Sequence, residues 1–326
     1  MPSRRAVLAL LATAPLAGCG GDADQSDESL LAGRTLAADA RVEFPSDTGV
    51  ALTDDVADAE AFVLPADADG YDTALDALDV GVPVVFVGRG SPGDAIRLCE
   101  QSDRAYGLPS RAWTAGERVA AVVPSGGRLT AQYLTPGTET TGVEALPWAV
   151  SEVLDGSAPD LSPSPVVGID LGWVRMGGRT DVGIYDRWDR VVLQRANGRA
   201  LVQTFARVDT VDAPFWDQYY LGDLSVDTAF DDAVEATVAL PDGTENWSVR
   251  TMRGEDGTSV SREFRVGGTG RRTLAFGTKT LVELDSSSSF SYVGNVRFDW
   301  RRNGILRDDT WTAHTPGRPV WRRPDQ

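Results

Sequence analysis

Three aspartates grouped in one short segment are the side chains best placed to do chemistry in this chain. Asp67, Asp69 and Asp72 follow directly on the apolar run 61–64. Carboxylate oxygens are the ligands that Ca²⁺ and Mg²⁺ prefer, and two carboxylates can share the work of nucleophile and general acid or base. The segment is therefore a candidate divalent-cation or ligand loop. The alternative is a solvated acidic loop that ends in a helix cap.

A glycine-rich turn supplies the second candidate. Gly88, Gly90 and Gly93 have the spacing Gly-x-Gly-x-x-Gly, after a valine-rich run at 82–87 and at the start of a helical pattern. Backbone N–H groups and a helix N-terminus in this context can hold a phosphate. No acidic residue follows about twenty residues later to bind a ribose. The segment is a possible anion-binding loop, and a plain strand-to-helix turn is the alternative.

Several kinds of catalytic site are excluded by residue counts. His314 is the only histidine and Lys279 the only lysine, and no Gly-x-Ser-x-Gly or His-Glu-x-x-His motif is present. Serine and cysteine hydrolases need a histidine base, for which only His314 is available, and an isolated histidine is far more often structural. Zinc sites need more histidines and cysteines than the chain has. Cys99 lies within a helical pattern, so we expect a buried structural thiol. With Cys19 as the other cysteine, no disulfide framework is expected within the chain.

The first twenty residues have the order of an export signal. Arg4 and Arg5 precede the apolar run 6–17, and Leu16-Ala17-Gly18-Cys19 follows. This segment resembles a twin-arginine signal joined to the lipobox of bacterial and archaeal lipoproteins. The resemblance implies export in the folded state, cleavage before Cys19 and a lipid on its sulfur. It places the protein on the outer face of the cytoplasmic membrane, with the lipid as its anchor.

The charge composition points to a soluble, strongly acidic surface. The chain has 48 acidic and 31 basic side chains, and nearly all of the basic ones are arginine. An acidic excess disfavours nucleic acid as a partner. Together with the signal, this composition resembles surface lipoproteins of salt-adapted archaea, in which hydrated carboxylates keep the protein soluble in concentrated salt.

The mature chain divides into two halves. After an acidic tether at 20–30, short apolar strands alternate with helical patterns at 71–78, 94–106 and 146–154, which predicts an α/β domain over 31–157 with a largely parallel sheet. A linker at 158–166 contains three prolines. Short strands with Gly-rich turns follow over 167–326, among them a hairpin around an Asn-Gly turn at 196–199, and predict an antiparallel β-sandwich or barrel.

Parts of the first half resemble known families. The strand and acidic loop with Asp67 and Asp69 are similar to the first motif of haloacid-dehalogenase-type phosphatases, which implies a nucleophile and an acid/base, although Tyr71 replaces the usual threonine. Asp67, Asp69, Gly70 and Asp76 resemble a calcium loop in part. Residues 61–67 and 81–89 also resemble a stretch of type I solute-binding proteins, whose strand ends line a ligand cleft.

The second half contains a possible glycosylation site and an arginine-rich tail. Asn246-Trp247-Ser248 is an acceptor pattern for N-glycosylation. The arginine-rich tail 297–326 carries a positive charge, whereas 20–157 carries 24 acidic and 8 basic side chains. We therefore hypothesise that the tail lies on the first half by charge attraction, with a solvated tail as the alternative.

These observations leave two functions open. The favoured one is a non-catalytic, lipid-anchored surface protein that binds a small solute or an envelope partner. The other is an extracellular hydrolase that uses the carboxylates of Asp67 and Asp69 with a divalent cation. Further carboxylates converging on the acidic loop would favour the hydrolase, and isolation of the loop would favour binding.

Overall fold

The architecture was obtained as a computed structural model of the whole chain. It describes residues 30–111, 117–136, 142–161, 167–194, 198–211, 219–240, 247–266, 273–284, 289–303 and 308–322. Cys19, Arg4, Arg5 and Asn246 lie outside these residues, as do the tether up to residue 29 and most of the expected linker.

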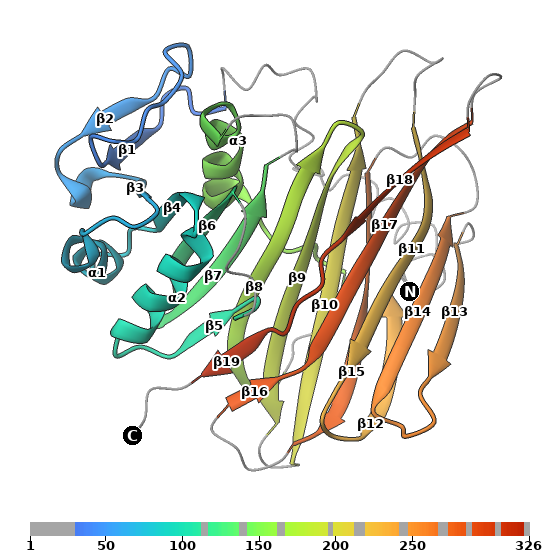
Figure 1. Cartoon of the computed structure of the whole chain (residues 1–326). Helices are drawn as coiled ribbons and strands as arrows, with labels where there is room; N and C mark the ends of the chain where they lie inside the picture. The colour runs from blue at the N-terminus through green and yellow to red at the C-terminus, as the bar shows by residue number, and fades with distance from the viewer. Residues whose placement is uncertain are drawn as a thin grey trace, which may run out of the picture.

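Two sheets make up most of the molecule (Figure 1). The larger, sheet A, has the order β12-β15-β10-β9-β8-β7-β6-β4-β3-β1-β2, with β5, β16 and β19 attached at its side. Its strands are β1 Thr35–Ala38, β2 Ala51–Thr53, β3 Ala61–Pro65, β4 Val84–Arg89, β5 Tyr106–Leu108, β6 Glu117–Ser125, β7 Arg128–Thr135, β8 Ile169–Thr180, β9 Gly183–Gln194, β10 Arg199–Thr210, β12 Val234–Leu240, β15 Thr273–Glu283, β16 Ser289–Ser291 and β19 Val320–Arg322. Sheet B has the order β13-β14-β11-β17-β18, with β11 Tyr220–Ala229, β13 Trp247–Arg253, β14 Ser259–Val266, β17 Val293–Asn303 and β18 Asp308–His314.

The N-terminal end of sheet A is mixed in direction and covered by helices. Strands β2, β1, β3 and β4 pair in parallel, whereas β4 with β6 and β6 with β7 pair antiparallel. Helices α1 (Tyr71–Asp79) and α2 (Ser91–Gln101) share one core with one face of these strands, and α3 (Gly142–Asp155) packs on the other. Strands buried on both faces explain the continuous apolar runs at 61–64 and 84–87.

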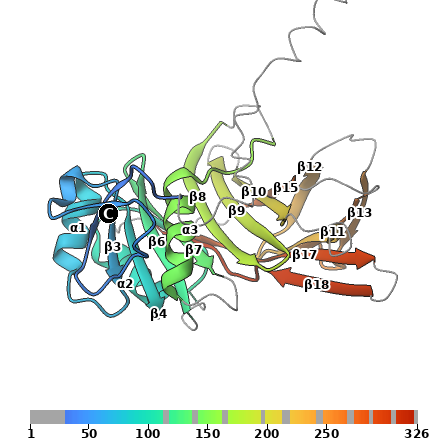
Figure 2. The same cartoon turned by 90° about the horizontal axis from the view of Figure 1, so that it is seen from above.

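The second half of the chain forms a β-sandwich (Figure 2). Alternate residues of β10 and β15 point into a core shared with β11, β14 and β17 of sheet B. The core is rich in aromatic rings, and Phe276 lies 5.1 Å from Phe264 and 6.0 Å from Phe298 between ring centroids. Burial of such rings drives the packing of one sheet on the other.

Some sequence expectations are confirmed and others change. Strands β9 and β10 pair antiparallel as expected, with Gln194 opposite Arg199, and residues 195–197 of the turn lie outside the described residues. Strands β12 and β13 follow one another in the chain but do not pair, because β12 lies in sheet A and β13 in sheet B. The helix expected at 94–106 begins at Ser91 and ends at Gln101. Proline is tolerated in a first helical turn, as at Pro92, and the backbone is already extended at Ser102.

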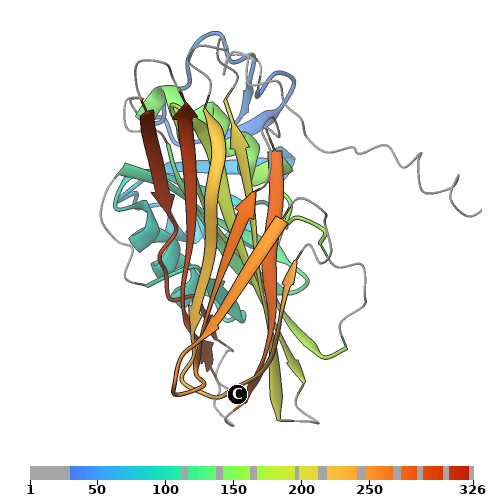
Figure 3. The same ribbon diagram turned by 90° about the vertical axis from the view of Figure 1, so that its right-hand side faces the viewer.

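The two halves are joined within one sheet. Strands β7 and β8 pair in parallel, so sheet A continues from the helix-covered end into the sandwich. Strands β17 and β18 run side by side along the molecule in sheet B (Figure 3). After β18, the chain crosses to sheet A, where β19 pairs with β5 on one side and β16 on the other.

The described tail returns to the first half through backbone pairing of β19 with β5. The ion pairs of Arg297, Arg301 and Arg318 are all made within the second half, with Asp299, Asp223 and Asp231 respectively. In the part of the tail that the structure describes, these three arginines therefore make no ion pair with the first half. Backbone pairing of β19 with β5 and the burial of a tryptophan side chain attach this part.

Candidate functional site

The acidic loop is held by a carboxylate that the sequence reading did not single out. Asp94, in the first turn of α2, is fully buried. Its Oδ2 accepts the backbone N–H of Asp67 at 3.2 Å, and its Oδ1 accepts the hydroxyl of Tyr71 at 2.5 Å. Asp67 has a φ of 60°, a left-handed conformation that this backbone hydrogen bond helps to hold. Asp94 therefore fastens the loop to α2.

The three predicted aspartates do not form a cluster in the described structure. The side chains of Asp67, Asp69 and Asp72 are exposed, and Asp72 lies in the first turn of α1. A carboxylate in this position interacts favourably with the helix dipole. Within the described residues, no three His, Cys, Asp or Glu side chains lie close enough together to hold a metal ion.

The glycine-rich turn between β4 and α2 needs backbone conformations that glycine adopts readily. Gly88 and Gly90 have φ values of 103° and 98°, which favour glycine. The N–H groups of Gly93 and Asp94 both donate to Gly90 O, at 2.7 and 3.4 Å. The buried carboxylate of Asp94 lies in the same first turn of the helix. A carboxylate in this turn disfavours a bound phosphate, and the anion-binding role of the loop stays a prediction.

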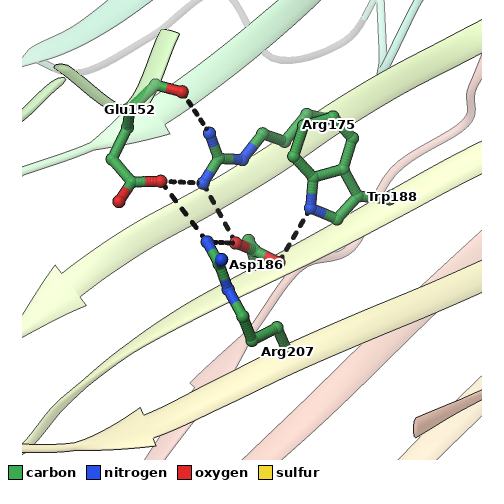
Figure 4. A network of polar contacts seen from close by, with 5 residues as sticks. All are labelled: Glu152, Arg175, Asp186, Trp188 and Arg207. Carbon is green, nitrogen blue, oxygen red and sulfur yellow. Dashed lines mark hydrogen bonds and ion pairs between the residues drawn. The ribbon is translucent and has the colours of Figure 1, made fainter. Parts of the chain in front are cut away.

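A buried ionic network fixes α3 to the outer face of the sandwich (Figure 4). Arg175 and Asp186, on β8 and β9, are each about 1 % exposed and pair at 3.0 Å. Arg175 also binds the side chain of Glu152, and its Nη1 donates to Glu152 O at 2.8 Å near the C-terminus of α3. Arg207 pairs with Asp186 at 2.7 Å, and Trp188 Nε1 donates to the same carboxylate at 2.9 Å. The positive charges of Arg175 and Arg207 balance the negative charges of Glu152 and Asp186, so the network has a structural role.

Cys99 is a buried thiol, as expected. Burial raises its pKa to about 12, so that almost no reactive thiolate exists at neutral pH. We predict that iodoacetamide will not label Cys99 in the native chain and will label it once urea unfolds the protein, with the labelled fraction measured by mass spectrometry. Rapid labelling of the folded chain would contradict this arrangement.

The outer face of sheet B contains a groove of about 400 Å³ that sequence reasoning missed. It lies where β11 and β13 end and where β14 and β17 begin. Its floor is a row of three polar residues on neighbouring strands: Ser261 lies opposite Asp227, and Asp227 lies opposite Asn295. The remaining lining residues are Thr228, Ala229, Met252, Arg253, Gly254, Ser259, Val260, Val293 and Gly294.

Hydrogen bonds orient the groove's polar row. Asp227 Oδ1 accepts the hydroxyl of Ser261 at 2.5 Å, and Oδ2 accepts that of Ser225 at 3.2 Å. Asn295 Nδ2 lies 3.4 Å from Nδ1 of His314, the only histidine. Asn295 Oδ1 is buried and has no hydrogen-bond partner in the described structure. A carboxylate keeps lone pairs after two hydrogen bonds, so the floor still offers several acceptors.

The sequence contained only a weak signal for this site. Ser225-Val226-Asp227 alternates polar and apolar residues, as expected of a strand with one exposed face. The three residues of the row lie far apart in the chain, and only the strand register brings them together.

Comparisons with known proteins identify no family. No protein-family model matches the chain, and no curated protein does. Among solved structures, an uncharacterised Nocardia farcinica protein with an immunoglobulin-like fold matches 39 % of this chain and 90 % of its own, at 13 % identity and a TM-score of 0.22. The C-terminal domain of Streptococcus agalactiae BspA matches 43 % of this chain and 58 % of its own, at 10 % identity and 0.21.

A third similarity is to the major pilin SpaD of Corynebacterium diphtheriae, over 43 % of this chain and 36 % of the pilin, at 15 % identity and a TM-score of 0.26. At such scores, none of these similarities carries a functional conclusion. In the part of the chain that the structure describes, no helix is both long and apolar enough to cross a membrane.

Proposed function

We propose that this protein is a non-catalytic surface protein, anchored by a lipid on Cys19, that binds a component of the cell envelope. The groove on sheet B carries the proposal, because it combines a concave surface with polar groups oriented in advance. Export would follow the signal at Arg4 and Arg5, and Asn246 would be available for glycosylation. Residues 31–157 would act as an α/β domain beside the sandwich.

The arrangement of the acidic loop supports binding over hydrolysis. One further carboxylate, Asp94, reaches the loop, but both of its oxygens accept hydrogen bonds from the protein itself. A metal-dependent hydrolase would need Asp67 and Asp69 to converge on a shared ligand, and both are exposed. The hydrolase therefore remains the less supported alternative.

A single introduced thiol tests the proposal. Cys99 is buried, and Cys19 would carry the lipid, so Val293→Cys would supply one reactive thiol at the groove, where Val293 is 52 % exposed. Val238→Cys, at 48 % exposure on β12, is the matched control. Intact cells are treated with a membrane-impermeant maleimide that carries a photo-crosslinking group.

We expect both thiols to react on intact cells, and illumination to give an envelope adduct from position 293 only. Adding Asp227→Ala should remove that adduct. Thiols that react only after cell lysis would contradict the surface location. Equal adducts from positions 238 and 293, or none from either, would contradict binding at the groove.

A further inference from the structure

The chemistry of the groove restricts what it can bind. Among the described residues that line the groove, only Asp227 and Arg253 are charged, and their charges are opposite. A strongly anionic ligand would meet the carboxylate of Asp227. A metal cation would find a single carboxylate, whereas calcium sites in proteins use several oxygen ligands. The lining therefore favours a ligand without net charge.

The polar row demands a ligand that donates hydrogen bonds. Asp227 accepts hydrogen bonds from Ser225 and Ser261 and retains further acceptor capacity in the groove. Hydroxyl groups meet this need, because each donates one hydrogen bond and can accept others from Ser259 or the Asn295 amide.

Apolar side chains lie next to the polar row of the groove. Ala229 lies between Ser259 on β14 and Val293 on β17, and Met252 lies opposite Ser261 at the β13 end of the polar row. Polar groups beside apolar side chains match a sugar ring, which has hydroxyls at its edge and C–H groups on its face. A volume of about 400 Å³ is also within the range of small-ligand sites.

From this geometry we infer that the groove binds an uncharged saccharide, with Asp227 accepting its hydroxyl groups. This inference rests on the proposed function, since it names the class of envelope component that the groove takes. The binding face is the exposed side of β11, β14 and β17, and the acidic loop has no part in it.

Saturation-transfer NMR on the full chain tests the inference. The probes are the methyl glycosides of glucose, mannose, galactose and N-acetylglucosamine. The test variants are Asp227→Ala and Asn295→Leu, with Asp227→Asn as a variant of nearly unchanged volume. The matched control is Asp223→Ala, because Asp223 lies on the same strand and face, is half-exposed and pairs with Arg301 outside the groove.

We expect at least one probe to bind the wild type and Asp223→Ala equally, and its affinity to fall by roughly tenfold or more in the Asp227 and Asn295 variants. Unchanged unfolding midpoints show that the variants are folded. No binding of any probe to the wild type, or equal binding to all variants, would overturn the inference. If an Asp227-dependent adduct to an envelope protein forms while no saccharide binds, the proposed function stands and the saccharide assignment fails.

Discussion

Replacing Asp189 with alanine should cost about 3–5 kcal/mol of folding free energy, because it leaves a guanidinium buried without its counter-ion. Arg187 and Asp189 are at most 1 % exposed inside the sandwich, and Arg187 Nε lies 2.8 Å from Asp189 Oδ2. Asp189 Oδ1 also accepts the hydroxyls of Tyr292 at 2.5 Å and Thr204 at 2.9 Å. Burial and the nearby Asp189 both raise the pKa of Tyr292, which keeps its phenol protonated as a donor.

The position of this network explains the size of the effect. Tyr292 lies where the chain passes from β16 in sheet A to β17 in sheet B. Arg187 Nη1 donates to Thr315 O at 2.8 Å, where the chain passes back from β18 to β19. Loss of Asp189 would therefore loosen both crossings between the sheets.

Urea unfolding measures the cost, with Asp223→Ala as the matched control. Asp223 pairs with Arg301 at the surface, where both side chains are about half exposed, and its loss should cost less than about 1 kcal/mol. The double variant Arg187→Met/Asp189→Leu should recover most of the stability, because no charge is then left buried. A cost for Asp189→Ala no larger than that of the surface control would contradict the buried pair.

Replacing Trp321 with alanine should cost about 3–5 kcal/mol, in the range of large-to-small substitutions in cores. Trp321 is 2 % exposed, its ring stacks on Tyr292 at 6.3 Å, and its Nε1 donates to Gly172 O at 3.3 Å. Gly107 on β5 makes room for it, since a Cβ there would lie 2.9 Å from the Trp321 ring. The side chain thus fastens β19 between the two halves of the chain.

Urea unfolding again provides the measurement. Trp311→Ala is the control, because Trp311 lies on β18 and is only partly buried, so its loss should cost less. Equal losses for the two tryptophans would show that attachment of β19 adds nothing to the stability of the fold.

The sequence predicted the elements whose pattern is local. Three kinds of element could be predicted from the sequence: the apolar strands at 61–64 and 82–87, the three helices, and the antiparallel pair β9 and β10. Each has its own periodicity or turn residues. The sandwich followed from short strands with Gly-rich turns. Strand β8 has no regular alternation of polar and apolar residues, because Gly177 and Gly178 interrupt it. Both glycines pack against β9. A Cβ at Gly178 would lie 2.6 Å from the Tyr185 hydroxyl.

The buried charges of β9 were also unreadable. Asp186, Arg187 and Asp189 look like the polar residues of a solvated strand, yet all three are buried. Their partners come from β8, β10 and the crossings between the sheets. The groove depends in the same way on the register of three strands. The acidic loop was visible in the sequence, but its control by Asp94, 27 residues after Asp67, depends on how α2 packs.

Carboxyl footprinting on isolated envelopes tests the central claim most directly. A carbodiimide and an amine probe label exposed carboxylates, and mass spectrometry gives the extent at each residue with and without envelope material. Our account predicts that the envelope protects Asp227 and leaves Asp67, Asp69 and Asp72 labelled as in the isolated protein. Protection of those three aspartates, with Asp227 labelled as before, would contradict it and move the binding site to the acidic loop.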